Sequence, residues 1–202
     1  MIAKSGESCA IVPNGVDFEE FGVDRPIEER RDKLVLFIAY DLEFKGTSDA
    51  IEAVIAAKSR VPDMKAAAFG ICIRPQTLPD WIPYYQNPTT TQIRQLYNSA
   101  SVFIGSSWSE GFGLTGCEAA LCGAALCMAD NGGHREYSFH DSTALLHPPR
   151  RPEVLAANIV SLLDDDARRT TMAGRARELV LRYSWGSSVS ALEEFLRAGS
   201  KI

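Results

Sequence analysis

The sequence predicts an α/β fold with a doubly wound parallel sheet and helices on both faces. Short apolar runs alternate with amphipathic helical patterns along most of the 202 residues. Each connection is long enough to hold a helix, as parallel neighbouring strands require. With 46% hydrophobic and 23% charged residues, the composition is that of a single globular domain that buries a full core.

The first half predicts strands and helices in turn. Residues 33–39 (KLVLFIA) form a buried strand, and the amphipathic helix that follows has Thr47, Ser48 or Asp49 as its N-cap and ends near Pro62. The further elements of this half are a strand at 65–70, a short strand within 81–88, a threonine-capped helix at 89–100 and a strand at 101–107.

The second half continues the alternation and then becomes helical. A helix at 113–123 is closed by Gly123, and strands are expected at 124–129 and 143–149. Three helices separated by polar breaks complete the chain, within 151–166, 167–184 and 185–199. The acidic run at 164–166 fits a solvated helix junction, with Asp166 as a cap, better than a metal site. We divide the single domain into a leading segment (1–33), an α/β core (34–182) and a closing helix (183–202).

Charge and cysteine content exclude several classes of function. A net charge of -5 and a pI of about 5.3 argue against nucleic acid and anionic membranes as partners. The five cysteines, at 9, 72, 117, 122 and 127, form no C-x-x-C pair and fit reduced, buried thiols in a cytosolic protein better than a metal site. The sequence has no signal peptide pattern and no apolar stretch long enough to span a bilayer.

Three polar, glycine-containing stretches follow predicted strands. They are FKG with Lys45 and Gly46, EGFG at 110–113, and NGGHRE at 131–136. In a doubly wound sheet the carboxyl ends of the strands and the helix N-termini gather at one edge, where ligands bind. Each stretch alone is also compatible with an ordinary turn. We expect His134 to be a surface histidine of its loop, with a phosphate contact as the alternative.

Two glutamates flank the second stretch and raise the question of what they meet. Glu118 lies in an otherwise apolar helix, where an unpartnered carboxylate costs several kcal/mol. Vicinal hydroxyls of a sugar would satisfy both of its oxygens. Glu110 precedes the turn, so the amides of 111–113 lie between the two carboxylates and suit a diphosphate. This order of groups matches that of a nucleotide-sugar.

The spacing of Glu110 and Glu118 is the Glu-x7-Glu motif, and EGFGLTGCEAALCG resembles the retaining family-4 glycosyltransferases of the GT-B fold. The likeness extends from about residue 11 to about residue 198. It includes IVPNGVDFEEF, the Lys-Gly pair at 45 and 46, the stretch that begins NGGHREYS, and LVLRYSWGSSVSALEEFL. The resemblance implies a Rossmann-like domain that forms the C-terminal half of a GT-B fold.

The resemblance also implies roles for individual residues. Glu110 contacts the donor hexose, Glu118 accepts hydrogen bonds from the ribose, and Lys45 neutralises the departing diphosphate without a metal. Glu110 and Lys45 are the expected catalytic residues, and the donor is a UDP-, GDP- or dTDP-sugar. The further donor-binding residues that the likeness implies are Tyr40, Gly46, Gln86, Asn87, Gly111, Phe112, Gly113, Leu114 and Gly133.

The sequence departs from the family pattern in two ways. Ala39 and Tyr40 stand where the family commonly has Gly-Arg, so the diphosphate depends on Lys45 alone or on another cation such as Arg74 or Arg135. The N-terminal acceptor domain of a GT-B enzyme has no counterpart here. We therefore expect weak donor binding without turnover, in a cytoplasmic protein of polysaccharide biosynthesis that reaches the inner membrane only through the missing domain.

Two other functions are compatible with the same residues. One is a catalytically inert nucleotide-sugar-binding module, which the missing arginine favours, and the other is a different GT-B chemistry such as that of an epimerase or a phosphorylase. Trp81, Tyr84 and Tyr85 fit packing better than base stacking, although the main chain near Gln86 and Asn87 lies where the family often holds the base.

Overall fold

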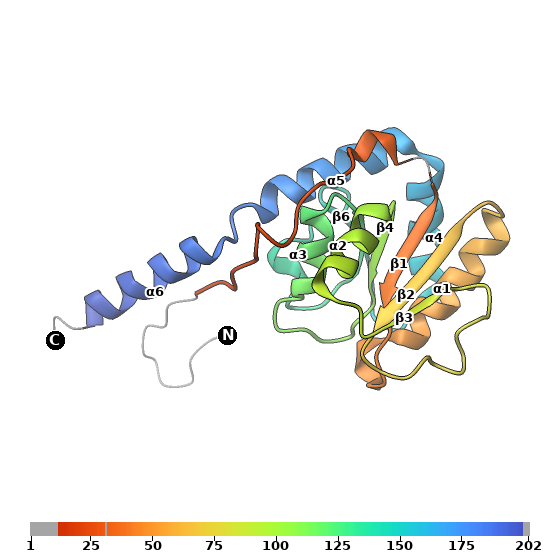
Figure 1. Cartoon of the computed structure of the whole chain (residues 1–202), viewed down its shortest axis with the longest axis horizontal. Coiled ribbons are helices and arrows are strands. Elements are labelled where there is room, and N and C mark those ends of the chain that lie inside the picture. Colours follow the sequence, from red (N-terminus) through yellow and green to blue (C-terminus); the bar gives the residue numbers. More distant parts are fainter. Residues whose placement is uncertain (1–11, 31, 200–202) are drawn as a thin grey trace.

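A six-stranded, entirely parallel sheet forms the centre of the protein (Figure 1). The computed structural model describes residues 12–30 and 32–199. The strand order β3-β2-β1-β4-β5-β6 is that of a Rossmann fold, which confirms the predicted fold class. The strands are β1 (Leu34–Ile38), β2 (Lys65–Gly70), β3 (Tyr84–Gln86), β4 (Val102–Gly105), β5 (Ala125–Ala129) and β6 (Ala144–His147).

Helices cover both faces of the sheet. The α-helices are α1 (Thr47–Arg60), α2 (Thr90–Ser99), α3 (Leu114–Leu121), α4 (Pro152–Asp164), α5 (Asp166–Val180) and α6 (Trp185–Gly199). Three single-turn 3-10 helices are η1 (Ile27–Glu29), η2 (Glu43–Lys45) and η3 (His134–Glu136). Helices α1 and α4 pack on one face and α2 and α3 on the other, while α6 projects away from the body (Figure 1).

The alternation of side chains along each strand produces two hydrophobic layers. Val35 and Phe37 point toward α1 and α4, whereas Leu36 points toward α2 and α3. All three are fully buried. A parallel sheet covered on both faces explains why its strands read as continuous apolar runs in the sequence.

The start of α1 differs from the prediction. Its N-cap is Gly46, at φ 67°, and no side chain caps the helix. The Thr47 hydroxyl instead bonds the backbone of Tyr40, and the Asp49 carboxylate accepts from the Trp108 indole at 2.8 Å. Thr47 and Asp49 are thus engaged by the loops that surround the helix, whereas Ser48, the third predicted cap residue, is exposed.

The other predicted helix ends are mostly confirmed. Thr89 caps α2 in a reciprocal capping box with Gln92, and Gly123, at φ 87°, follows the end of α3. The predicted N-cap of α5, Asp166, is wrong by one residue. The N-cap is Asp165, whose side chain accepts the hydrogen bond from the Arg168 amide.

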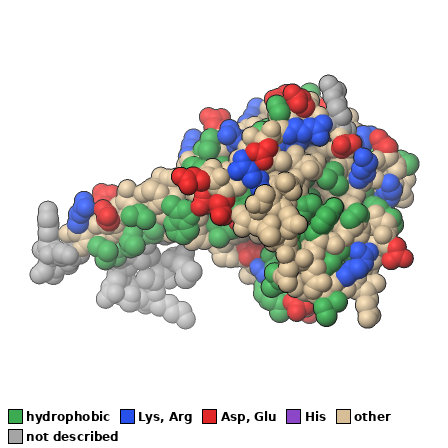
Figure 2. Space-filling view, in the orientation of Figure 1, with side chains coloured by type: hydrophobic (Ala, Val, Ile, Leu, Met, Phe, Trp, Pro, Cys, Tyr) green, Lys and Arg blue, Asp and Glu red, His purple; other side chains and the backbone are tan. Residues whose placement is uncertain are grey.

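The cysteines and the last helix complete the description of the fold. Cys117, Cys122 and Cys127 are buried free thiols as predicted, Cys72 is half-buried, and Cys9 lies outside the described residues. Apolar side chains line part of the surface of α6 (Figure 2), among them Val189, Leu192 and Phe195. No helix within the described ranges is long and apolar enough to cross a bilayer.

Candidate functional site

The carboxyl edge of the sheet has a topological switch point between β1 and β4. The chain proceeds from β1 to β2 in one direction and later places β4 on the opposite side of β1. The loops that follow these two strands therefore separate above the sheet, which is where ligands bind in open α/β sheets. Ile38 ends β1 and Gly105 ends β4 on either side of this point.

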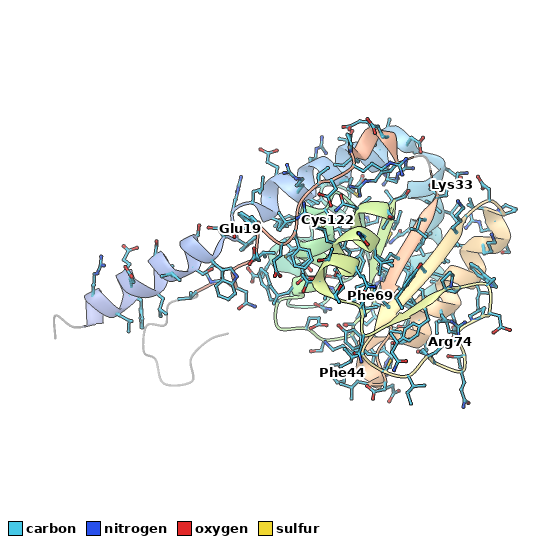
Figure 3. All side chains as sticks on the ribbon, in the orientation of Figure 1. Glu19, Lys33, Phe44, Phe69, Arg74 and Cys122 are labelled. Atoms are coloured by element: carbon cyan, nitrogen blue, oxygen red, sulfur yellow. The ribbon has the colours of Figure 1, made fainter. Side chains whose placement is uncertain are left out.

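Two hydrogen bonds to main-chain carbonyls connect the two loops. The Trp108 amide donates to the Phe44 carbonyl at 2.7 Å, and the Ser106 hydroxyl donates to the Lys45 carbonyl at 3.1 Å. A β-carbon on Gly46 would lie 2.2 Å from the Ser106 carbonyl oxygen, so glycine is required there for space as well as for its positive φ. Figure 3 shows Phe44 beyond the end of β1, on the loop that carries Lys45.

Lys45 and Glu110, from these two loops, form an ion pair. The Lys45 Nζ atom lies 2.7 Å from Glu110 Oε1, and each side chain is 19% exposed. The ammonium also lies 5.1 Å from the centre of the Tyr40 ring and 5.5 Å from that of Phe44. This group borders a hollow, called here the Lys45 hollow, whose other walls include Ile38, Ser106, Thr115 and His134.

Glu118 lies in a neighbouring cleft of about 260 Å³, called here the Glu118 cleft. Its Oε2 atom accepts a hydrogen bond from the Tyr97 hydroxyl at 3.1 Å. Burial raises the pKa of the Glu118 carboxyl, while the bond from Tyr97 acts in the opposite direction. Ile38, Tyr40 and Thr115 line both the Glu118 cleft and the Lys45 hollow, so the two glutamates border adjoining spaces.

The glycine turn between the glutamates joins all three predicted stretches. Gly113, at φ 87°, begins α3. A β-carbon on it would lie 2.6 Å from the His134 ring, and one on Gly133 would lie 2.6 Å from the Glu110 carbonyl oxygen. The loop at 131–136 is therefore packed against the main chain of the Glu110 turn, as the sequence predicts for stretches that share one edge.

Phe112 and its neighbours in this turn have different environments. The Phe112 ring is buried, with its centre 5.7 Å from that of Tyr137 and 5.3 Å from that of Tyr183. Only the main chain of Phe112 can therefore approach a ligand. Gly111 and Leu114 are exposed at the same turn.

The prediction that His134 lies on the surface is wrong. The side chain is 3% exposed and its Nδ1 atom lies 2.9 Å from the Ala129 carbonyl oxygen. Burial lowers the pKa of the imidazole, which favours its neutral form. Gly133 lets the loop pack closely against the Glu110 carbonyl, and the turn brings the His134 ring to the wall of the Lys45 hollow.

The residues predicted near the base are only partly brought to the site. Asn87, at φ 49°, borders the Glu118 cleft, and its amide donates to the Gly70 carbonyl at 2.8 Å. Gln86 is exposed at the end of β3 and does not line that cleft. Trp81, Tyr84 and Tyr85 do not line it either.

The alternative cations are engaged elsewhere. The Arg74 guanidinium donates to the carbonyls of Leu78, Pro79 and Ile82. Arg135 forms an ion pair with Asp130 at 2.7 Å. Within the described ranges, Lys45 is thus the cation that borders the hollow between β1 and β4.

Sequence reasoning missed two residues of the site. Tyr97 donates a hydrogen bond to Glu118, but in the sequence it is one residue on the apolar side of a predicted helix. Thr115 lies one turn before Glu118 and lines the same cleft, and the residue type did not single it out. Neither residue type nor spacing indicated a role for them. In the described part of the chain, no group of three or more histidine, cysteine, aspartate or glutamate side chains is placed to hold a metal ion.

The fold and the site define a Rossmann-type domain with polar groups at its switch point, and comparison with known proteins assigns the domain to a family. The family model described as glycosyl transferases group 1 matches residues 23–179. This chain belongs to the glycosyl transferases group 1 family.

Curated relatives agree with the family. D-inositol 3-phosphate glycosyltransferase of Corynebacterium glutamicum is 27% identical over 92% of this chain and 50% of its own length. Phosphatidyl-myo-inositol mannosyltransferase of Mycolicibacterium smegmatis is 28% identical over the same shares. The chain thus spans about half the length of these relatives.

Solved structures share the fold. Sucrose-phosphate synthase of Thermosynechococcus elongatus matches 96% of this chain with 53% of its own, at a TM-score of 0.80 and 21% identity. HepE of Anabaena in complex with UDP-glucose matches 96% of this chain with 57% of its own chain, at a TM-score of 0.77 and 20% identity. The C-terminal domain of a group 1 glycosyl transferase, LpcC of Francisella tularensis, matches 85% of this chain over its whole length, at a TM-score of 0.74 and 23% identity.

Proposed function

We propose that this chain is the donor-binding half of a retaining, metal-independent glycosyltransferase that takes a hexosyl group from a nucleoside diphosphate sugar. Glu118 accepts hydrogen bonds from the ribose hydroxyls, Lys45 holds the diphosphate, and Glu110 contacts the hexose. The observation that carries the proposal is the half-buried Glu118 carboxylate, which borders the Glu118 cleft and has one hydrogen-bond donor, Tyr97, among the described side chains. A carboxylate in this state is suited to a ligand that supplies further donors.

The Lys45 hollow provides the electrostatics for the departing group. In the free protein Glu110 neutralises the Lys45 ammonium at 2.7 Å. In the proposed complex, the diphosphate occupies the space between β1 and β4. It replaces Glu110 as the ion-pair partner of Lys45 and accepts hydrogen bonds from the backbone amides at the start of α3. Glu110 then becomes available to the hexose hydroxyls, and Lys45 stabilises the charge that develops on the diphosphate.

The comparisons support the donor class. HepE, which shares the fold, has been solved with UDP-glucose, and relatives at the level of sequence are named as glycosyltransferases of inositol-containing acceptors. We propose a nucleotide-sugar such as a UDP-, GDP- or dTDP-hexose for this chain. Tyr40, which borders both spaces, and the main chain near Gln86 and Asn87 complete the donor contacts.

The acceptor site belongs to the other half of the proposed enzyme. Because the chain spans about half of each full-length relative, a second domain would supply the acceptor contacts. The acceptor is a glycan, a lipid or a small molecule. We expect this half alone to bind donor weakly and not to transfer the sugar, in the cytoplasm or at the membrane surface.

One observation favours a second function. Tyr40 stands where the family commonly has an arginine, and the hollow contains one cation from the described residues. A domain that binds a nucleotide-sugar but does not catalyse transfer would tolerate this loss. If a protein that contains both this chain and the proposed acceptor-binding half transfers the sugar, the binding-only function is excluded.

Calorimetric titration tests the ribose assignment. UDP, GDP and dTDP are titrated into the purified chain, and the nucleotide that binds is then titrated into Glu118→Ala. We expect the affinity to fall by roughly ten- to a hundredfold, the usual effect of removing a hydrogen-bonded charged partner. Glu178→Ala, at an exposed position on α5, should bind as the parent does. Equal affinity in Glu118→Ala and the parent would refute the assignment.

A further inference from the structure

Tyr97 stands out among the residues around the Glu118 cleft because it is fully buried and yet donates its hydroxyl to the site. Its ring meets those of Phe21, Phe69 and Phe103 edge-on, with centres 6.0, 5.8 and 5.5 Å away. Three such contacts fix both side-chain torsions of a tyrosine. The hydroxyl can therefore point in one direction, toward Glu118 Oε2.

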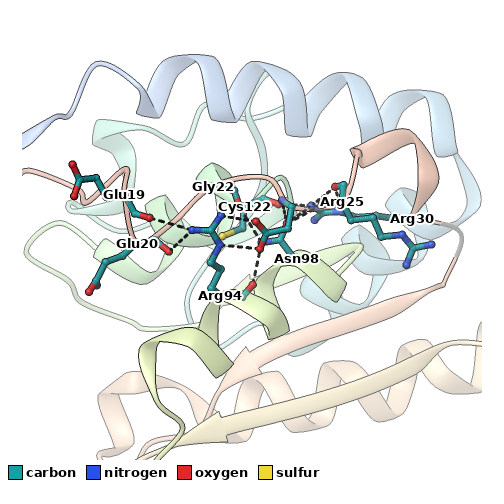
Figure 4. A network of polar contacts seen from close by, with 9 residues as sticks. Glu19, Glu20, Gly22, Arg25, Arg30, Arg94, Asn98 and Cys122 are labelled. Atoms are coloured by element: carbon teal, nitrogen blue, oxygen red, sulfur yellow. Dashed lines mark hydrogen bonds and ion pairs between the residues drawn. The ribbon is translucent and has the colours of Figure 1, made fainter.

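The two helices that carry Tyr97 and Glu118 are clamped at their C-terminal ends. The Arg30 guanidinium donates to the carbonyls of Tyr97 and Ala100 at the end of α2, each at 3.3 Å, and to the Cys122 carbonyl at the end of α3. Asn98 Oδ1 accepts from the same guanidinium at 3.2 Å. Figure 4 shows Arg30, Asn98 and Cys122 meeting in this network.

A cation at two helix C-termini is favourable because the helix dipoles place partial negative charge there. The clamp fixes the distance between α2 and α3, and the aromatic cluster fixes the Tyr97 ring. The 3.1 Å bond to Glu118 is therefore held from both sides. The other carboxylate oxygen has no hydrogen-bond donor among the described residues.

We propose that Tyr97 is a positioning residue for nucleotide binding: its hydroxyl holds one oxygen of Glu118 and leaves the other aimed at the ribose. The inference rests on the proposed function, because it gives Glu118 the ribose as its ligand. The bond also favours the ionised carboxylate, which is the form that accepts from two hydroxyls. Tyr97 thus links the core of the domain to its site through Glu118.

The other groups that face Glu118 cannot replace this bond. Glu20, from the leading segment, raises the pKa of the Glu118 carboxyl, as burial does, whereas Tyr97 lowers it. Burial raises the pKa values of Tyr40, Cys117 and Tyr137, and the charge of Glu118 raises each of them further. Removing the Tyr97 hydroxyl therefore raises the pKa of Glu118 further.

The test is the pH profile of UDP affinity, or that of whichever nucleoside diphosphate the chain binds, in the parent and in Tyr97→Phe. The phenylalanine keeps the ring contacts. We expect affinity to fall roughly tenfold at neutral pH, and the loss of binding on acidification to begin at a higher pH. Tyr183→Phe is the matched control, because it removes a hydroxyl that donates to the Glu136 carbonyl away from Glu118, and it should leave both quantities unchanged.

The outcomes separate the inference from the proposed function. A parent chain that binds none of the nucleotides contradicts the proposed function. A parent that binds, with an identical pH profile in Tyr97→Phe, overturns the inference alone, and so does a lower affinity with an unshifted onset, since a loosened structure weakens binding at every pH.

A second measurement covers the case in which Tyr97→Phe does not fold. The Tyr97 hydroxyl proton, observed by NMR in the parent chain, should shift when Glu118 is protonated and in Glu118→Gln. A hydroxyl resonance that ignores both changes would overturn the inference.

Discussion

Two polar groups that involve α2 and α3, one around the buried Arg30 and one around the half-buried Glu118, differ in how completely they are paired. At the C-terminal ends, Arg30 is 2% exposed and its guanidinium meets four carbonyls and the Asn98 side chain. At the carboxyl edge of the sheet, and counting the described residues alone, Glu118 has one donor and the ion pair of Lys45 is with Glu110. The Arg30 guanidinium has its hydrogen bonds satisfied within the fold. Glu118 can still accept hydrogen bonds from a ligand, and Lys45 can still donate them.

This difference shows how a structural network is told from a binding site. Burial of a charge is tolerated when hydrogen bonds surround it, and such a network stabilises the fold. A buried carboxylate with few donors is instead a candidate functional group, because its cost must be compensated by something else. Changing each group separately should therefore affect stability in one case and ligand affinity in the other.

The largest expected effect is on stability, from Arg30→Met. The substitution leaves the carbonyls of Ala100 and Cys122 without the donor that Arg30 supplies, and each buried carbonyl that is left unsatisfied costs roughly 1–3 kcal/mol. Urea unfolding followed by circular dichroism measures this change. Arg60→Met, at an exposed position near the end of α1, should change stability by no more than about 0.5 kcal/mol. Similar values for the two variants would show that the Arg30 network is not structural.

Lys45→Ala should affect binding in a ligand-specific way. Removing the ammonium should weaken UDP roughly tenfold or more and leave uridine almost unchanged, because a charge-assisted contact to phosphate is lost. Calorimetry or competition titration at constant ionic strength measures both ligands. Lys65→Ala removes an exposed lysine that pairs with Asp32 and serves as the control. If UDP and uridine weaken equally, the role of Lys45 is structural.

The smallest expected effect is a gain in stability for Glu118→Gln. The glutamine oxygen can still accept from Tyr97 but carries no charge, and the raised pKa of Glu118 shows that its ionised form is disfavoured by folding. We expect the free energy of unfolding at pH 7.5 to rise by about 1 kcal/mol or less. The gain should vanish as the pH falls through the pKa of Glu118, because the parent carboxyl is then neutral too.

Chemical denaturation at several pH values measures that gain. Glu178→Gln, at an exposed position on α5, provides the baseline for losing one surface charge. A clear loss of stability in Glu118→Gln would mean that the carboxylate is paired for structure, as Arg30 is.

Much of the fold follows from the sequence, because a sheet buried on both faces leaves a strong pattern of apolar runs and amphipathic helices. The strands and helices of the core lie where the pattern predicts them, and the residues that follow the strands do gather at one edge. The N-cap of α1 could not be predicted, because Thr47 and Asp49 are taken by bonds to Tyr40 and Trp108, which are distant contacts that the fold creates.

Residue type and spacing singled out Lys45, Glu110 and Glu118, and the structure brings the three to adjoining spaces at one edge, while their roles stay predictions. The burial of His134 was missed because it depends on a turn back under the edge. Tyr97 was missed because an inward-facing tyrosine on an amphipathic helix looks like core packing, and its hydroxyl acquires a role only from the position of α3.

The most direct test of the central claim is a crystal structure of this chain with UDP or the nucleoside diphosphate that it binds. We predict that the ribose hydroxyls donate to Glu118, that Tyr97 keeps its bond to the same carboxylate, and that the diphosphate lies beside Lys45 between β1 and β4. A nucleotide bound away from this edge, or a ribose that makes no contact with Glu118, would contradict the account.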